Sequence, residues 1–96
     1  MNMVMLILEG DLTPDKAAKL EANFADGVQT QDPGLVESFF VKNQNKCKII
    51  TLWESREALS SMKSKGTPKW VLMFRYAGAE PTMLAYDVVN SFMKGI

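Results

Sequence analysis

The sequence predicts one α+β domain, residues 1–96, in which helices cover one face of a four-stranded antiparallel sheet. Three observations lead to this expectation. Short β-rich apolar runs alternate with segments of helical periodicity, the two central runs are separated by a polar connector suited to a hairpin, and 96 residues fit a single domain. The resulting order of elements is that of a split β-α-β unit.

The first half of the chain predicts one strand and one helix. Residues 3–8 form an apolar run that is too short for an independent helix. A helix is expected from Pro14, because Thr13 can cap it and proline suits the first helical position. Its apolar stripe is Ala17, Leu20, Phe24 and Val28. The turn Asp32-Pro33-Gly34 must end any helical stretch before it.

The second half predicts a hairpin, two helices and a last strand. Residues 35–41 and 47–53 should pair antiparallel across the polar connector 42–46. Ser55 can cap a helix that ends near Gly66. Thr67-Pro68 repeats the Thr-Pro start of the first helix, and residues 82–89 alternate as a strand.

The side-chain pattern of the hairpin predicts a dimer. If Lys42 opposes Cys47, one face carries Val36, Ser38, Phe40, Cys47, Ile49, Thr51 and Trp53. The other face then carries Leu35, Glu37, Phe39, Val41, Lys48, Ile50 and Leu52. Both faces hold large apolar residues, and the helices can cover only one of them. We therefore expect a homodimer that forms through the uncovered sheet face.

Composition excludes several classes of function. Eleven basic and eleven acidic residues balance, so no global charge favours nucleic acid as a partner. No apolar run approaches the length that spans a membrane. Cys47 is the single cysteine, and the N-terminal run lacks the features of a signal peptide, which predicts a cytoplasmic location. Because histidine is absent, we assign no metal site and no cofactor.

Three segments resemble a known family. They are Asp32-Pro33-Gly34-Leu35, the string Lys48-Ile49-Ile50-Thr51-Leu52-Trp53-Glu54-Ser55-Arg56-Glu57-Ala58-Leu59, and the ending Tyr86-Asp87-Val88-Val89-Asn90-Ser91-Phe92-Met93-Lys94. The second string is similar to the strand-to-helix signature of the antibiotic biosynthesis monooxygenase family, and the third resembles the closing strand of its haem-degrading branch. The resemblance implies a ferredoxin-like fold that dimerises into an α+β barrel.

The resemblance does not carry over the reactive residues of that family. In the haem-degrading branch it would imply an asparagine on the first strand, a tryptophan on the helix after the motif and a histidine on the next helix. These positions fall at or near Leu8, Met62 and Leu72, which are all apolar. Many quinol-oxidising relatives also have a histidine near Met62. Trp53, which closes a strand before a helix, is expected to be a core residue.

Two sets of candidate site residues remain. An apolar ligand pocket between sheet and helices would be lined by Phe24, Phe40, Met62, Trp70, Met73 and Phe74, although the same residues would also make an ordinary core. The polar catalytic candidates are Asp87, Tyr86, Tyr76, Arg75 and Asn90. Asp87 would suit general-base catalysis if it were buried; the alternative is an exposed aspartate paired with Lys or Arg.

Two functional hypotheses follow. The first is a cofactor-independent monooxygenase that acts on a phenolic or quinol-type small molecule, and it comes from the family resemblance. The second is a non-catalytic dimeric module that binds a small hydrophobic or aromatic ligand, and it comes from the missing histidine and the inert Met62 and Leu72. Haem degradation is a distant third.

Overall fold

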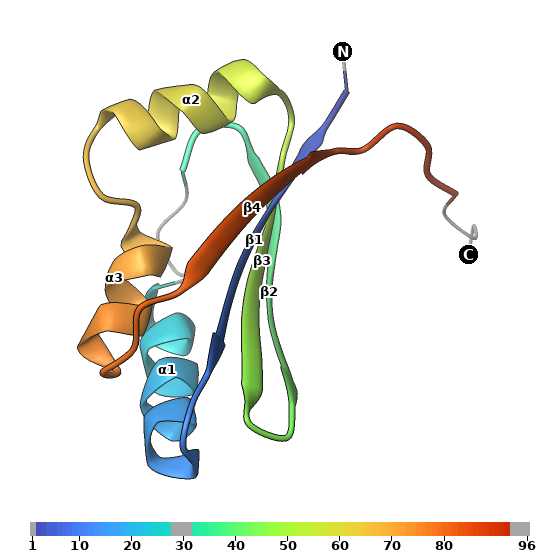
Figure 1. Cartoon of the computed structure of the whole chain (residues 1–96). Coiled ribbons are helices and arrows are strands. Elements are labelled where there is room, and N and C mark those ends of the chain that lie inside the picture. Colours follow the sequence, from blue (N-terminus) through green and yellow to red (C-terminus); the bar gives the residue numbers. More distant parts are fainter. Residues whose placement is uncertain (1, 28–31, 93–96) are drawn as a thin grey trace.

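The computed structural model describes residues 2–27 and 32–92. The elements are β1 (Val4–Asp11), α1 (Pro14–Gly27), β2 (Leu35–Asn43), β3 (Lys46–Trp53), α2 (Arg56–Ser64), α3 (Lys69–Tyr76) and β4 (Thr82–Asp87). The strands form one antiparallel sheet in the order β2-β3-β1-β4. This confirms the predicted α+β, ferredoxin-like arrangement (Figure 1).

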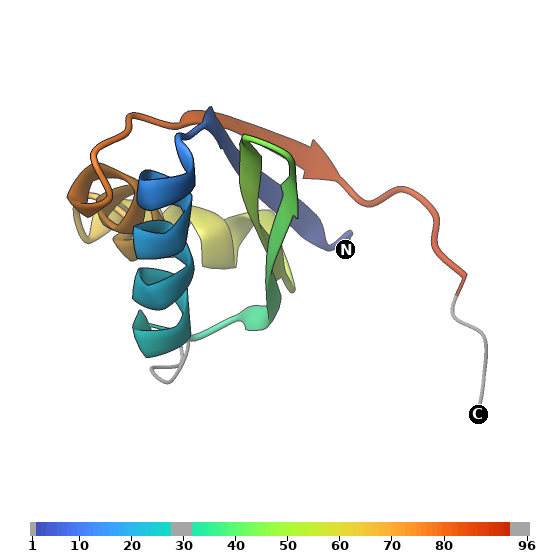
Figure 2. The same ribbon diagram turned by 90° about the horizontal axis from the view of Figure 1, so that it is seen from below.

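The three helices lie on one side of the sheet, and the other side is open (Figures 1 and 2). The covered face holds the alternate residues Val4, Leu6 and Leu8 of β1 with Cys47, Ile49, Thr51 and Trp53 of β3, and all of them are buried. From the helices, Leu20, Leu59 and Phe74 close the core. No described helix is long and apolar enough to cross a membrane.

Local chemistry explains where the first two helices begin. The Thr13 carbonyl accepts a hydrogen bond from the amide of Ala17 at 2.8 Å, and the Thr13 hydroxyl lies 3.5 Å from the amide of Lys16. At the start of α2, the Ser55 hydroxyl accepts from the amide of Ala58 at 3.1 Å. Both predicted caps are therefore confirmed, because each side chain satisfies an amide that has no partner within its helix. Val28, the last residue of the predicted stripe, lies outside the described residues.

The ends of several elements differ from the prediction. β1 runs on to Asp11 rather than ending near residue 8, and β4 ends at Asp87 rather than at residue 89. α3 begins one residue later than expected, with Pro68 rather than Thr67 at its N-cap, because the Pro68 carbonyl accepts the bonds from Val71 and Leu72. The hairpin loop is shorter than the predicted connector, because β2 and β3 pair as far as Asn43 and Lys46. Gln44 makes this tight turn with a φ of 54°.

The predicted register of the hairpin is confirmed, since Lys42 pairs with Cys47. The prediction was wrong at the start of β2. An irregularity between Leu35 and Glu37 shifts the register, so that Leu35 lies opposite Trp53 and packs on the core. Val36 is left exposed, whereas the alternation had assigned it to the face of Trp53. A bulge inserts one unpaired residue and thereby reverses the faces beyond it.

Candidate functional site

The interior between sheet and helices contains two tryptophans in contact. The rings of Trp53 and Trp70 meet edge to face at 88°, with centroids 5.6 Å apart, and both side chains are buried. Trp53 Nε1 donates to the Thr51 hydroxyl at 2.8 Å, and this hydroxyl donates to the Leu6 carbonyl at 3.4 Å. Trp53 is therefore a core residue with a satisfied polar atom, as its position before α2 predicts.

The six predicted pocket residues gather in one cluster. Trp70, Met73 and Phe74 of α3 are buried in the core. Phe24 of α1, Phe40 of β2 and Met62 of α2 are partly buried and pack against it. The Phe24 and Phe40 rings lie 6.0 Å apart. The cluster thus has a packed floor and a partly exposed rim.

Trp70 carries a polar atom without a partner in this cluster. Its Nε1 is buried and makes no hydrogen bond to the described residues. The Lys69 ammonium lies 5.0 Å from the centroid of the Trp70 ring and 3.1 Å from Asp32 Oδ2. Lys69 also donates to the Gly27 carbonyl at 3.1 Å, so it joins the end of α1, the turn before β2 and the start of α3. The Lys69 ammonium thus lies over the Trp70 ring, while the Trp70 N–H has no partner among the described residues.

Two of the polar candidates form ion pairs on the surface. Asp87 is exposed; its Oδ1 accepts a hydrogen bond from Arg56 Nε at 3.0 Å and forms an ion pair with Arg56 Nη2 at 2.9 Å. This is the alternative described for Asp87, in which an arginine neutralises the carboxylate. Arg75 makes two bonds to Glu80, at 2.9 and 2.8 Å, which raise the pKa of Arg75 and lower that of Glu80.

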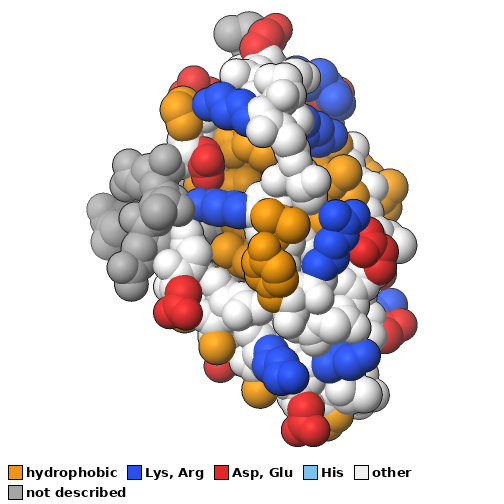
Figure 3. All heavy atoms as spheres, turned by 90° about the vertical axis from the view of Figure 1, so that its left-hand side faces the viewer, with side chains coloured by type: hydrophobic (Ala, Val, Ile, Leu, Met, Phe, Trp, Pro, Cys, Tyr) orange, Lys and Arg blue, Asp and Glu red, His pale blue; other side chains and the backbone are white. Residues whose placement is uncertain are grey.

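The other three polar candidates lie on separate surfaces. Tyr76 is on α3 and is 75% exposed, on the helical side of the molecule. Figure 3 shows that side, where apolar, basic and acidic side chains are interspersed. Tyr86 is on the opposite face of the sheet, and Asn90 is exposed beyond the end of β4. The fold therefore does not bring the polar candidates together into one site.

The sheet face opposite the helices is the main apolar surface that the structure leaves without a partner among the described residues. We call it the open face, and its apolar side chains are Met5, Ile7, Phe39, Val41, Ile50, Leu52, Leu84 and Tyr86. Leu84 is 58% exposed, Tyr86 51%, and Phe39 and Val41 41% each. The register places Phe39, Ile50, Ile7 and Leu84 side by side across all four strands.

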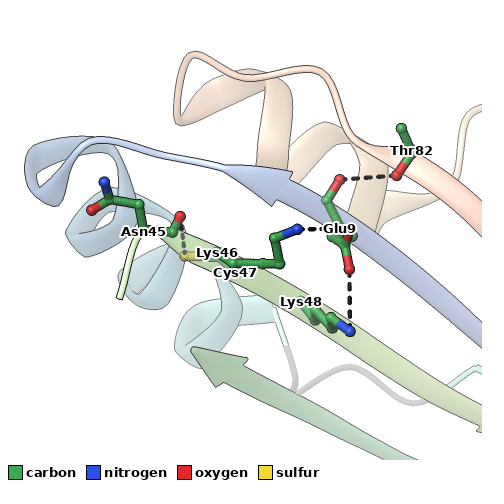
Figure 4. A network of polar contacts seen from close by, with 6 residues as sticks. All are labelled: Glu9, Asn45, Lys46, Cys47, Lys48 and Thr82. Atoms are coloured by element: carbon green, nitrogen blue, oxygen red, sulfur yellow. Dashed lines mark hydrogen bonds and ion pairs between the residues drawn. The ribbon is translucent and has the colours of Figure 1, made fainter. Parts of the chain in front are cut away.

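Charged residues border the open face at its hairpin end (Figure 4). The Glu9 carboxylate forms ion pairs with Lys48 Nζ at 3.1 Å and with Lys46 Nζ at 3.5 Å. The hydrogen bond from Lys48 is the main reason why the pKa of Glu9 is lowered. The Thr82 hydroxyl donates to the Glu9 carbonyl at 3.3 Å. A hollow of about 360 Å³ lies beside these lysines, lined by Val41, Lys42, Asn43, Lys46, Lys48 and Ile50. The strand pattern predicts the apolar face but not this ion-pair network, which depends on the register.

The described residues offer no cluster suited to a metal ion, since no group of three or more His, Cys, Asp or Glu side chains gathers among them. Cys47 is buried in the core, and burial raises the pKa of its thiol. A protonated, buried thiol has little nucleophilic character. Cys47 therefore packs as a small apolar residue.

Comparison with known proteins identifies solved structures that share this fold. No known protein-family profile matches the sequence, and no curated protein matches it either. Several solved structures do match. A protein assigned as an antibiotic biosynthesis monooxygenase from Caulobacter crescentus superposes with a TM-score of 0.68 at 21% identity, covering 93% of this chain and 92% of that one.

Two further matching structures belong to proteins with a stated activity. SnoaB, a cofactor-independent oxygenase from Streptomyces nogalater, has a TM-score of 0.65 at 15% identity and covers 97% of both chains. A haem-degrading protein from Mycobacterium tuberculosis has a TM-score of 0.69 at 21% identity, covering 95% of this chain and 99% of that one. The resemblance noted in the sequence is thus confirmed at the level of the fold, and a shared fold does not fix an activity.

Proposed function

We propose that this chain is a homodimeric module that binds a small aromatic ligand between its sheet and its helices. The observation that carries this is the unpaired, buried Nε1 of Trp70 inside an otherwise apolar cluster. An unsatisfied buried donor costs about 1–3 kcal/mol, so a ligand oxygen that accepted this hydrogen bond would stabilise the protein. Pockets of this kind combine apolar walls with a few polar groups that orient the ligand.

A ligand would reach Trp70 through the rim of the cluster. Phe24, Phe40 and Met62 come from three different elements, are partly exposed and pack against the core, so these side chains would have to move apart to admit it. Methionine adapts readily to such changes, because its side chain is unbranched and polarizable. The ligand class is then a small, flat ring compound with at least one acceptor oxygen, such as a phenol, hydroquinone or quinone.

Conservative variants of the two tryptophans test the ligand site. Hydroquinones, quinones and phenols are titrated while melting temperature and tryptophan fluorescence are recorded, because a ligand that binds the folded state raises its melting temperature. Trp70→Phe keeps an aromatic ring but removes the N–H, and we expect it to weaken binding roughly three- to tenfold. Trp53→Phe is the matched control, since Trp53 Nε1 already donates to Thr51. Equal affinity of Trp70→Phe and wild type would contradict this site.

The dimer is supported by the open face. Several large apolar side chains that are 41–58% exposed on one sheet face are uncommon on a monomer. A two-fold axis through this face would stack two sheets and bury both copies of it. We expect such an interface to bury of the order of 2,000 Å² in total.

Light scattering at micromolar concentration tests the dimer. We expect twice the mass of the chain for the wild type and a monomer for Leu84→Lys, because a buried lysine without a counter-charge is costly. Tyr76→Lys is the control, since Tyr76 is similarly exposed but lies on the helical side. A wild-type monomer would contradict the dimer, and a dimeric Leu84→Lys variant would place the interface elsewhere.

The cofactor-independent oxygenase is the second candidate, and the fold shared with SnoaB favours it. The argument against it is that the polar candidate residues do not meet in one site, since Asp87 is paired with Arg56 and the two tyrosines lie on opposite sides of the molecule. An oxygen electrode separates the two candidates. Oxygen consumption that scales with protein and needs one quinol of the panel would establish the oxygenase; ligand-induced stabilisation without consumption would favour the binding module.

A further inference from the structure

The hollow at the hairpin end of the open face is separate from the Trp70 cluster. It measures about 360 Å³, and the six residues that line it all lie on β2 and β3. Val41 and Ile50 form its apolar part, whereas Asn43 and three lysines form its polar part. A space of this size that combines apolar walls with a few polar groups is typical of a site for a small molecule.

The ionic groups that line this hollow are all basic. They are Lys42, Lys46 and Lys48, and no described aspartate or glutamate lines it. Lys46 and Lys48 both point to Glu9, which pairs with them at 3.5 and 3.1 Å (Figure 4). One carboxylate therefore holds two ammonium groups beside the hollow and neutralises only one of them. Lys42 forms no ion pair with the described residues.

We infer that this hollow binds a small carboxylate with a flat apolar body, such as an arenecarboxylate. The carboxylate lies among the three ammonium groups, and the ring packs on Val41 and Ile50. A single negative charge suits the site, because Glu9 already shares Lys46 and Lys48. Inorganic phosphate has no apolar part to contact the two aliphatic side chains, so it should bind more weakly. The ligand is an anion, which distinguishes this site from the one at Trp70.

The position of the hollow leaves it accessible in the monomer and in the proposed dimer. β4 begins at Thr82, which pairs with Glu9, so β4 does not extend along the sheet to the hairpin turn. The hollow thus lies at a corner of the open face rather than at its centre. Charged residues commonly form the solvent-accessible rim of an interface, whereas its centre is apolar.

Titration with benzoate, followed by NMR of the backbone amides, tests the site. We expect saturable shifts that are confined to residues 41–50 and their neighbours on β1. Lys42→Gln and Lys48→Gln each remove one charge and should raise the dissociation constant for benzoate roughly two- to fivefold, the usual effect of one exposed ion pair. Lys63→Gln is the matched control, because Lys63 is an exposed lysine on α2, which follows the opposite end of β3.

Two further probes separate the charge from the apolar contact. Benzamide keeps the ring without the charge, and inorganic phosphate keeps the charge without the ring, so both should bind more weakly than benzoate. Shifts that do not saturate, or an affinity that is unchanged in both lysine variants, would overturn the site. Phosphate that binds as tightly as benzoate would overturn the role of Val41 and Ile50 and leave only a basic surface. None of these outcomes depends on the ligand site at Trp70.

Discussion

At the scale of single residues, the two tryptophans have opposite hydrogen-bonding states although they are in contact. Trp53 gives its N–H to Thr51, whereas the N–H of Trp70 has no partner among the described residues. From the sequence, Trp53 was expected in the core and Trp70 in the candidate pocket. Trp53 donates to a hydroxyl two residues earlier on the same strand, which alternation places on the same face. That Trp70 on α3 has no acceptor within reach could not be predicted from the sequence, because it depends on the packing of the helix on the sheet.

Replacement of Trp53 by alanine should lower the free energy of unfolding by about 3–5 kcal/mol, the usual cost of truncating a large buried aromatic residue. The side chain is fully buried and contacts Trp70 edge to face, and its removal also leaves the Thr51 hydroxyl without its donor. Urea denaturation at a fixed protein concentration measures the loss. A variant with wild-type stability would contradict the structural role and direct attention to a role in function.

At the scale of elements, helix starts could be predicted from the sequence better than strand ends. Ser55 caps α2 as its position predicts, because a cap depends only on residues within one turn. The faces of Leu35 and Val36 were exchanged, because an irregularity in β2 breaks the alternation. Nothing local in residues 35–37 marks this irregularity, which depends on how β2 leaves the preceding turn and meets Trp53. Strand faces remain predictable only as far as the register is continuous.

The turn before β2 should not tolerate a side chain at residue 34. Gly34 has a φ of +83°, a Cβ at this position would lie 2.4 Å from the Ala58 Cβ, and the Gly34 carbonyl accepts from the amide of Glu54 at 2.9 Å. Gly34→Ala should therefore cost at least about 2 kcal/mol in the free energy of unfolding, from backbone strain and from the clash with α2.

Gly66→Ala separates these two causes. Gly66 also has a positive φ, of +122°, but a Cβ there would meet nothing within 4 Å. We expect its destabilisation to be due to strain alone and to be smaller than that of Gly34→Ala in the same denaturation experiment. Equal losses in the two variants would show that contact with Ala58 is not what restricts residue 34.

At the scale of the whole molecule, the fold was predictable and the site only partly so. The order of elements and the two apolar faces of the sheet follow from alternation and turn residues, and the structure confirms both. The six pocket candidates do gather, because helical periodicity directs Trp70, Met73 and Phe74 of α3 to the sheet. The five polar candidates do not, because the sequence does not reveal that Asp87 and Arg75 each have an ionic partner on the surface.

The last prediction concerns haem, since one structure with this fold belongs to a haem-degrading protein. Stable ligation of haem iron requires an axial donor such as histidine, cysteine, methionine or tyrosine, and the chain has no histidine. Cys47 is fully buried with a raised pKa, Tyr76 and Tyr86 lie on outer surfaces, and Met62 offers a thioether at the rim of the cluster. We therefore expect no sharp, saturable Soret shift at one equivalent of haem.

With a reductant present, haem should also be lost no faster than it is in the absence of the protein. Absorption spectroscopy measures both properties, and Met62→Leu is the matched variant because it nearly preserves the volume of the side chain while removing the sulfur. Tight one-to-one binding that Met62→Leu abolishes would show that the thioether serves as an axial ligand. Binding that survives in Met62→Leu but is lost when Cys47 is replaced would mean that the core opens to expose the thiol, which the packing around Cys47 argues against.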